Sequence, residues 1–312
     1  MTEDKNVHIK FEPLDVSRII QDAQLRRQEH GEVVPLIEKE RETKSGRYIS
    51  AAGSNAEAVR VGNDDLYVDP ENGILAYSGP SNEASRLNEP GQDAVSVAIL
   101  TKSEGSKCFL LAQADGVGSA FTSDLAAGVA TRFLAENGST DLKENLSKTV
   151  VYMQGWGTDL PRVQTGHQFI NEAFDQNRLQ AGSRTTLNQL LITENAGEVK
   201  GLFHGDGEVV VIRADGAVER SRCGTTTTPS QISTKDGVLG QSQEFSSKLN
   251  SGDTILLFSD GLDKLGNDVL IQLSREVLST TPSVSQPKEI VQMIRSQSLR
   301  DDDISIVAYR RN

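Results

Sequence analysis

The chain has 312 residues, a formal net charge of −12, 36% hydrophobic residues and 5% aromatic residues. This length suits one large domain with an appendage, or two modest domains. The negative charge, with no long Lys/Arg cluster to offset it, argues against nucleic acid or an anionic membrane as the main partner, because both are bound largely by phosphate neutralisation. No run of ~18 uncharged apolar residues predicts a membrane-spanning helix.

Residues 1–65 differ in composition from the rest of the chain. Residues 16–28 have the apolar spacing of an amphipathic helix, and residues 38–45 are dense in charge. The polar start has no apolar run typical of a signal peptide. We therefore predict an N-terminal extension over residues 1–65, flexible or loosely docked, followed by a compact domain over residues 66–312. A partner-docking arm is the alternative interpretation of the extension.

The two cysteines, Cys108 and Cys223, are far apart in the chain. We interpret them as free thiols in a reducing compartment, which favours a cytoplasmic location.

Apolar runs and turn signals predict alternating strands and helices. The predicted strands are 94–100, 108–112, 185–193, 199–203, 209–213, 254–258 and 304–309, and the predicted helices are 123–134, 164–179, 268–278 and 287–294. Asp215-Gly216 and residues 195–198 are typical of hairpin turns. Antiparallel hairpins with helices inserted in groups predict an α+β layered sandwich and argue against a doubly wound parallel sheet.

Aspartates stand beside several of the predicted strands. Asp-Gly occurs five times, and a tight turn is the usual reason for the pair. Asp115 and Asp260 differ from the others, because each follows a continuous apolar strand and no matching strand begins two residues later. Asp93 and Asp302 precede apolar strands in the same way.

Converging carboxylates repel one another unless a cation lies between them. Oxygen-only ligands select Mg²⁺, Mn²⁺ or Ca²⁺ over zinc or copper, and a glycine carbonyl such as that of Gly116 can join them. The pattern therefore predicts a divalent-metal site, and metal-activated hydrolysis is the natural chemistry for it. His204 is the one histidine near these motifs, and we interpret it as a local hydrogen-bonding group. No zinc-ligand spacing, serine-hydrolase elbow or P-loop is present.

Five motifs in order resemble the type 2C, metal-dependent (PPM) protein phosphatases, and most of all their bacterial branch. The motifs are Gln92-Asp-Ala94, Ala114-Asp-Gly-Val-Gly-Ser-Ala120, Gly205-Asp-Gly207, Ser259-Asp-Gly261 and Asp301-Asp-Asp-Ile-Ser-Ile-Val307. The resemblance implies a four-layer α/β/β/α sandwich of two antiparallel sheets. It also implies two Mn²⁺ or Mg²⁺ ions, with a third, weaker position.

The resemblance assigns a role to each motif aspartate. Asp115 matches the bridging ligand, with the carbonyl of Gly116 beside it. Asp93, Asp260 and Asp302 match further carboxylate ligands, and Asp206 matches the third metal position. The catalytic set is then Asp115, Asp260 and Asp302.

Two positions depart from the family pattern. The arginine that binds phosphate in the family has Asn88 at its place, and Arg86 is the nearest candidate for substrate binding. Asp303 replaces the usual asparagine of the last motif. Asp303 adds negative charge near the site, where it tightens metal binding or is merely exposed.

The resemblance implies hydrolysis of phosphoserine and phosphothreonine in proteins by a water activated between two metals. The implied partners are a phosphorylated protein and a cognate Ser/Thr kinase. Two alternatives remain open: a catalytically weak, phospho-dependent binding protein, and a hydrolase of small phosphate esters.

Overall fold

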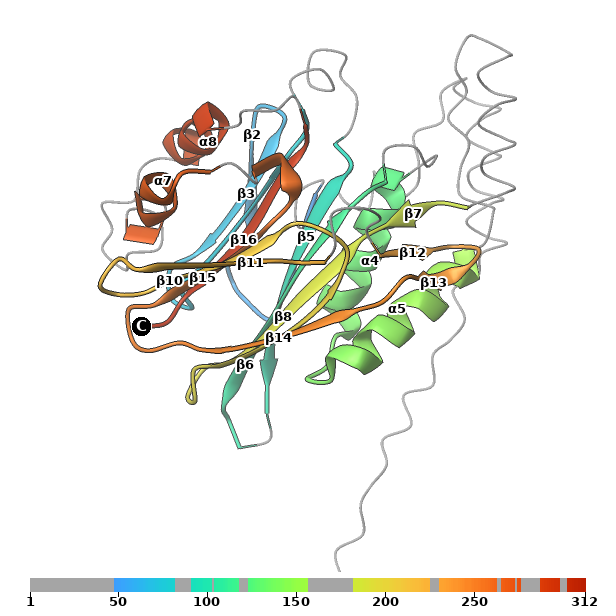
Figure 1. The fold of residues 1–312 in the computed structure, drawn as a ribbon, viewed down its shortest axis with the longest axis horizontal. Coiled ribbons are helices and arrows are strands. Elements are labelled where there is room, and N and C mark those ends of the chain that lie inside the picture. The colour runs from blue at the N-terminus through green and yellow to red at the C-terminus, as the bar shows by residue number, and fades with distance from the viewer. Residues whose placement is uncertain are drawn as a thin grey trace, which may run out of the picture.

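The protein is described here by a computed structural model, which covers residues 48–81, 91–102, 104–117, 123–156, 182–224, 230–262, 265–272, 274–275, 287–297 and 302–312. Two large β-sheets lie between two pairs of helices (Figure 1). Helices α4 (Ser123–Asn137) and α5 (Leu142–Trp156) lie on one side, and α7 (Asn267–Gln272) and α8 (Pro287–Gln297) lie on the other. The predicted α/β/β/α sandwich is confirmed.

The first sheet has six strands in the order β1-β5-β6-β8-β9-β14. The strands are β1 (Ile49–Ala52), β5 (Asp93–Thr101), β6 (Lys107–Asp115), β8 (Leu187–Thr193), β9 (Glu198–His204) and β14 (Gln243–Lys248). Its pairs are antiparallel except at one edge, where β1 pairs with β5 in parallel.

The second sheet has seven antiparallel strands in the order β11-β10-β15-β16-β4-β3-β2. The strands are β2 (Ala58–Val61), β3 (Asp64–Asp69), β4 (Ile74–Gly79), β10 (Glu208–Ile212), β11 (Val218–Arg222), β15 (Thr254–Phe258) and β16 (Ile304–Arg310). A small third sheet joins β7 (Arg184–Thr185), β12 (Gln231–Ser233) and β13 (Gly237–Leu239), and a 3₁₀ turn, η1 (Asp260–Leu262), follows β15.

Apolar side chains fill three layers, and the period-two alternation of the strands assigns each side chain to a layer. On β6, Phe109 and Leu111 pack between the two sheets, whereas Leu110 and Ala112 pack toward α4 and α5. A third cluster, which includes Phe258, fills the space between the seven-stranded sheet and the helices α7 and α8. Both sheets are therefore covered on both faces, and the strand ends are held rigidly.

Helices α4 and α8 begin where the sequence predicts them, and α7 covers the first part of the predicted helix 268–278. Helix α4 buries Leu125, Val129 and Phe133, as their spacing by four predicts. Helix α5 was not predicted from the sequence, although Asp141 caps it by accepting the backbone N–H groups of Lys143 and Glu144. The predicted helices at residues 16–28 and 164–179 lie outside the described residues.

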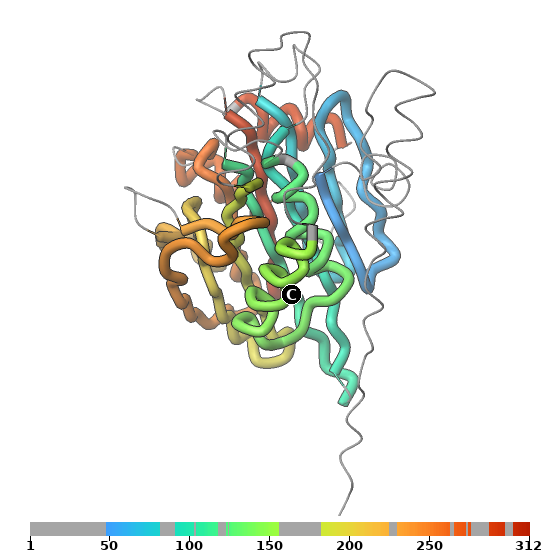
Figure 2. Tube along the Cα trace, turned by 90° about the vertical axis from the view of Figure 1, so that its right-hand side faces the viewer, coloured from blue at the N-terminus to red at the C-terminus, as the bar shows by residue number. Residues whose placement is uncertain are grey.

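The predicted domain boundary at residue 65 requires a correction. Strands β1 and β2 lie within the segment that we assigned to an extension, yet β1 pairs with β5 and β2 pairs with β3. Ile49 is buried in the core between the sheets, and Asp65 accepts the backbone N–H of Tyr48 at 2.7 Å. In Figure 2 this early segment (blue) runs beside the rest of the sheets. The extension can include only residues before 48, which lie outside the described ranges.

None of the helices in the described ranges has the length and hydropathy needed to cross a membrane. Cys108 and Cys223 are both buried and free, as predicted.

Candidate metal centre

Two aspartates of the six-stranded sheet face each other directly. Asp93 begins β5 and Asp115 ends β6, and the two residues are paired in the antiparallel register. Burial, and then the charge of Asp93, raise the pKa of Asp115. Like charges directly opposite on neighbouring strands are destabilising, so this pair favours either a proton or a cation between the two carboxyl groups.

The seven-stranded sheet brings Asp260 and Asp302 to the same end. Asp260 follows β15 and Asp302 precedes β16, which are neighbouring antiparallel strands. Between them, the Ser259 N–H donates to the Ser305 carbonyl at 3.1 Å, and the Ser305 N–H donates to Ser259 Oγ at 3.0 Å. The two carboxylate-bearing segments are thus held together by their own backbones.

A serine joins the two sheets at this end. Ser305 Oγ donates to Asp93 Oδ2 at 2.8 Å, and Ser78 Oγ donates to the Asp93 carbonyl at 3.0 Å. Both serines belong to the seven-stranded sheet and Asp93 to the six-stranded one. Asp93 is therefore fixed by residues of the opposite sheet.

The fifth aspartate, Asp206, lies between β9 and β10, in a connection that passes from the first sheet to the second. Pairing of Glu208 with Phe258 brings this connection beside the end of β15. Gly207 has φ of 104°, and a Cβ there would lie 2.5 Å from the Phe258 carbonyl oxygen. Only glycine fits this turn without strain, because L side chains rarely adopt such a φ.

The electrostatics of Asp115 show how closely the carboxylates gather. Burial raises the pKa of Asp115 well above its usual range, and the charges of Asp93, Asp260 and Asp206 raise it further. After burial, the largest contributions to this shift come from acidic side chains. The described surroundings of Asp115 are therefore dominated by negative charge.

Asp93 and Asp206 respond in the same direction. Burial and then the charge of Asp303 raise the pKa of Asp93 to about 7, although hydrogen bonds from Ser259 and Ser305 oppose the shift. Burial also raises the pKa of Asp206, and the charge of Asp302 adds to the effect, against a hydrogen bond from its own backbone N–H. The structure thus places Asp115 within electrostatic reach of Asp93, Asp206 and Asp260, and Asp206 within reach of Asp302.

The donor set fits a hard divalent cation, since it consists of carboxylate oxygens from four strand ends and one connection. In the described ranges, no three His, Cys, Asp or Glu side chains lie close enough together to hold a metal ion as they stand. A cation among these carboxylates would replace repulsion with attraction.

Gly116 lies where a backbone must come close to its neighbours. A Cβ at this position would lie 2.7 Å from the backbone of Ser123 and 2.9 Å from the Gln92 carbonyl oxygen. The Gly116 N–H donates to that same carbonyl at 3.1 Å. The glycine therefore lets the start of α4 approach the end of β6 and places the Gly116 peptide beside Asp115.

The two threonines that hydrogen-bond to the backbone of Asp115 were not predicted from the sequence. Thr185 Oγ1 donates to the Asp115 carbonyl at 2.9 Å, and Thr186 Oγ1 accepts the Asp115 N–H at 2.8 Å. The Thr186 N–H also donates to the Asp115 carbonyl at 2.8 Å. The available signal was a pair of hydroxyl residues directly before the apolar strand Leu187–Thr193, at the same kind of strand end as the aspartates.

The buried side-chain amides of Gln113 and Asn188 lie next to the connection that carries Asp206, and they were also not predicted. Asn188 Nδ2 donates to Gln113 Oε1 at 2.9 Å and to the Asp206 carbonyl at 2.5 Å. Gln113 Nε2 and Asn188 Oδ1 have no hydrogen-bond partner within the described part of the chain. Such atoms are a suitable place for buried water, and Asn188 fixes the peptide of Asp206.

The remaining predicted residues do not join this cluster. His204 is buried, with its ring nitrogens 3.0 Å from Ser242 Oγ and 2.9 Å from the Gln231 carbonyl, and burial lowers its pKa. It is a local hydrogen-bonding group, as expected. Asp215-Gly216 closes the β10–β11 hairpin, as predicted. Arg86 and Asn88 lie outside the described residues.

The chain is similar in fold to solved phosphatase structures. A crystal structure of a mutant bacterial serine phosphatase has a TM-score of 0.51 at 16% identity, covering 77% of this chain and 98% of that chain. The serine/threonine phosphatase Stp1 from Staphylococcus aureus has a TM-score of 0.51 at 15% identity, covering 76% of this chain and 94% of that chain. These similarities show the fold. No curated protein sequence is significantly similar to the chain.

The family model described as protein phosphatase 2C matches residues 79–301, which is more than half of the chain and includes the strand ends that carry Asp93, Asp115, Asp206 and Asp260. The chain belongs to the protein phosphatase 2C family.

Proposed function

We propose that this protein hydrolyses phosphoserine and phosphothreonine in proteins, with Mn²⁺ or Mg²⁺ bound among the five aspartates. The observation that carries the proposal is the antiparallel register that sets Asp93 opposite Asp115, with Asp206 and Asp260 near enough for their charges to raise the pKa of Asp115 further. A protein keeps such a cluster at a cost in stability, and a bound cation removes that cost. Family membership supports the same activity.

The residues that would hold metal are Asp93, Asp115, Asp260, Asp302 and the Gly116 carbonyl, with Asp206 at a third, weaker position. Metal bound there supplies a water of lowered pKa as the nucleophile and neutralises the phosphoryl oxygens. Thr185 and Thr186 hold the backbone of Asp115, and Ser305 orients the carboxylate of Asp93. The chain contributes orientation and negative charge, and no protein nucleophile is required.

Arg86 is the proposed phosphate-binding residue, by its place a few residues before Gln92-Asp93 in the sequence. If Arg86 binds the substrate phosphate, Arg86→Ala should raise KM more than it lowers kcat. An unchanged KM would remove Arg86 from the site.

The proposed partners are a phosphorylated protein and a Ser/Thr kinase that generates it. A hydrolase of small phosphate esters remains the second candidate, because the chemistry of the carboxylate site is the same for both substrates.

One experiment tests these assignments together. Turnover of p-nitrophenyl phosphate and of a phosphothreonine peptide should require added Mn²⁺ or Mg²⁺ and should disappear with EDTA. A strong preference for the peptide supports a protein phosphatase, and a preference for the small ester supports the second candidate. Full activity of metal-stripped protein would rule out the mechanism.

We further propose that residues 1–47 are not needed for catalysis, since none of the matched motifs lies there. A chain beginning at residue 48 should retain turnover of p-nitrophenyl phosphate. A loss confined to a protein substrate would indicate that these residues dock the substrate and raise its effective concentration.

A further inference from the structure

Asp303 differs from the other aspartates at this end of the sheets, because its carboxylate is occupied by backbone donors. Asp303 Oδ1 accepts the Ser81 N–H at 2.5 Å, and Asp303 Oδ2 accepts the Gln92 N–H at 2.5 Å. The residue is half-buried, so it is not the merely exposed side chain that the sequence left as one interpretation. Both of its oxygens have a specific structural task.

The two donors come from opposite sheets. Ser81 follows β4 and Asp303 precedes β16, both in the seven-stranded sheet. Gln92 precedes β5 in the six-stranded sheet and is the immediate neighbour of Asp93. The Asp303 carboxylate therefore links the two sheets at the end where their metal-site aspartates meet.

Each end of this link is also next to a proposed metal ligand in the sequence. Asp302 is bonded to Asp303, and the Asp303 N–H donates to Asp302 Oδ1 at 2.9 Å. Through Gln92, the same residue controls the start of β5 and so the position of Asp93. A single side chain thus connects the backbones that carry one carboxylate of each sheet.

A carboxylate suits this position better than the asparagine usual in related sequences. Both groups that point at Asp303 are donors, and a carboxylate offers two acceptors. An amide offers one acceptor, and its NH₂ would face the second N–H. Hydrogen bonds to a charged group are also stronger than neutral ones. Burial and then the charge of Asp302 raise the pKa of Asp303, and the hydrogen bonds from Gln92 and Ser81 and the charge of Arg295 in α8 oppose this shift.

We propose that Asp303 is a positioning residue that sets the separation between the carboxylates of the two sheets and so determines metal affinity. The proposal rests on the proposed metal site, but it does not depend on which phosphate ester is hydrolysed. It predicts that the loss of one acceptor oxygen loosens the junction of the sheets and weakens metal binding.

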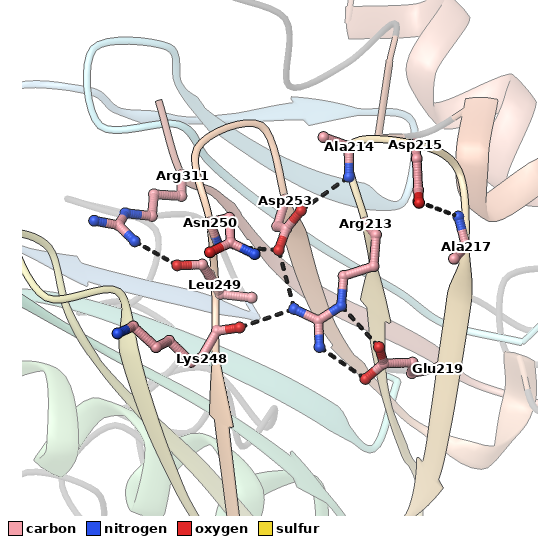
Figure 3. Close-up of polar contacts among 10 residues, drawn as sticks. All are labelled: Arg213, Ala214, Asp215, Ala217, Glu219, Lys248, Leu249, Asn250, Asp253 and Arg311. Carbon is pink, nitrogen blue, oxygen red and sulfur yellow. Dashed lines mark hydrogen bonds and ion pairs between the residues drawn. The ribbon is translucent and has the colours of Figure 1, made fainter.

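The test compares two isosteric variants, Asp303→Asn and Asp253→Asn. Asp253 is a matched control, because it also accepts two backbone N–H groups, those of Asn250 and Ala214, each at 2.9 Å, but at the other end of β15 (Figure 3). Amide hydrogen exchange is measured by NMR in metal-free protein, and Mn²⁺ affinity is measured by calorimetry. Circular dichroism checks the fold, and Asp303→Ser replaces the amide variant if that variant does not fold.

In Asp303→Asn, exchange at Ser81 or Gln92 should accelerate by roughly tenfold or more, the effect of losing a hydrogen bond to a charged group. Mn²⁺ affinity should fall on the order of tenfold, as for the loss of a partner that orients a metal ligand. Asp253→Asn should accelerate exchange at Asn250 and Ala214 and leave Mn²⁺ affinity unchanged.

Unchanged exchange at both Ser81 and Gln92 would overturn the proposal. So would faster exchange with unchanged Mn²⁺ affinity, or an equal loss of affinity in Asp253→Asn. Wild-type protein that binds Mn²⁺ but hydrolyses no phosphate ester would overturn the proposed function and leave this inference standing.

Discussion

The two ends of β15 hold buried or half-buried aspartates in opposite electrostatic surroundings. Asp253, before the strand, forms an ion pair with Arg213 at 3.0 Å and accepts two backbone N–H groups (Figure 3). Asp260, after the strand, adds to the repulsion around Asp115. An aspartate thus stabilises the fold at one end of β15, whereas the aspartate at the other end adds to the electrostatic repulsion among acidic side chains.

The pKa values express this difference. Burial alone would raise the pKa of Asp253, but hydrogen bonds from Asn250, Arg213 and Ala214 outweigh it and hold the pKa below its usual range. At the other end, burial and acidic neighbours raise the pKa of Asp115. Asp253 is thus held by a basic group and backbone donors, whereas Asp115 lies among acidic side chains, as the proposed metal site requires.

Arg213 supplies the positive charge that compensates the carboxylate of Asp253. Its guanidinium donates to both oxygens of Glu219, to the Lys248 carbonyl and to Asp253, and so ties the β10–β11 hairpin to the connection before β15 (Figure 3). Arg213 thus compensates both Glu219 and Asp253, whereas the groups that act most strongly on Asp115 are acidic.

The largest expected effect is on turnover. Asp115→Asn or Asp260→Asn should reduce phosphatase turnover by at least roughly 100-fold, since even the loss of a residue that supports a metal ligand typically costs about 10–100-fold. The metal-free protein should not lose stability, because the substitution removes a repelling charge. Steady-state kinetics and thermal unfolding measure the two results.

Asp215→Asn is the control for this prediction, because Asp215 only accepts the Ala217 N–H in a hairpin turn. It should leave turnover unchanged. Wild-type turnover of Asp115→Asn at saturating Mn²⁺ would contradict the assignment of the metal site.

The next effect is on stability at the opposite end of β15. Asp253→Ala should lower the free energy of unfolding by about 1–3 kcal/mol, because it leaves Arg213 and two backbone N–H groups without an acceptor. Turnover per folded molecule should not change. Chemical denaturation and an activity assay below the unfolding transition would reveal the opposite pattern if Asp253 had a catalytic role.

In metal-free protein, the contributions of Asp93 and Asp253 to the free energy of unfolding should change with pH in opposite directions. The folded pKa of Asp93 is raised from 3.8 to about 7, so its contribution to stability falls as the pH rises across that window. The folded pKa of Asp253 is lowered, so its contribution is present above about 3.8 and is lost as the pH falls through the folded value. Urea denaturation of Asp93→Asn should reveal the first effect as a stability gain over wild type that grows from pH 4 to pH 7 (about the limits of the window). A gain independent of pH would contradict it.

The smallest expected effect concerns Asp206, which we assign to the third metal position. Asp206→Ala should reduce turnover while calorimetry still detects two bound Mn²⁺ ions. Loss of a tightly bound ion would place Asp206 in the main site, alongside Asp115 and Asp260.

The sequence determined much of the fold, because local patterns act directly on local structure. Predicted strand 254–258 agrees with β15, and the runs at 94–100 and 304–309 agree with β5 and β16 within one residue. Strands β1 and β2 escaped prediction because they are short and lack a long apolar run, and their pairing supplies what their sequence does not.

For the candidate site, the sequence determined which residues carry charge and where strands end. The ordered aspartate motifs were sufficient to identify the family, and they predict five carboxylate ligands. Only the tertiary structure decided their surroundings, because the partners of a carboxylate come from distant segments. It placed Asp93 opposite Asp115, Thr185 and Thr186 behind Asp115, and the donors Ser81 and Gln92 on Asp303. The sequence around an aspartate does not reveal whether an arginine or another aspartate lies opposite it, because that neighbour comes from a distant segment of the chain.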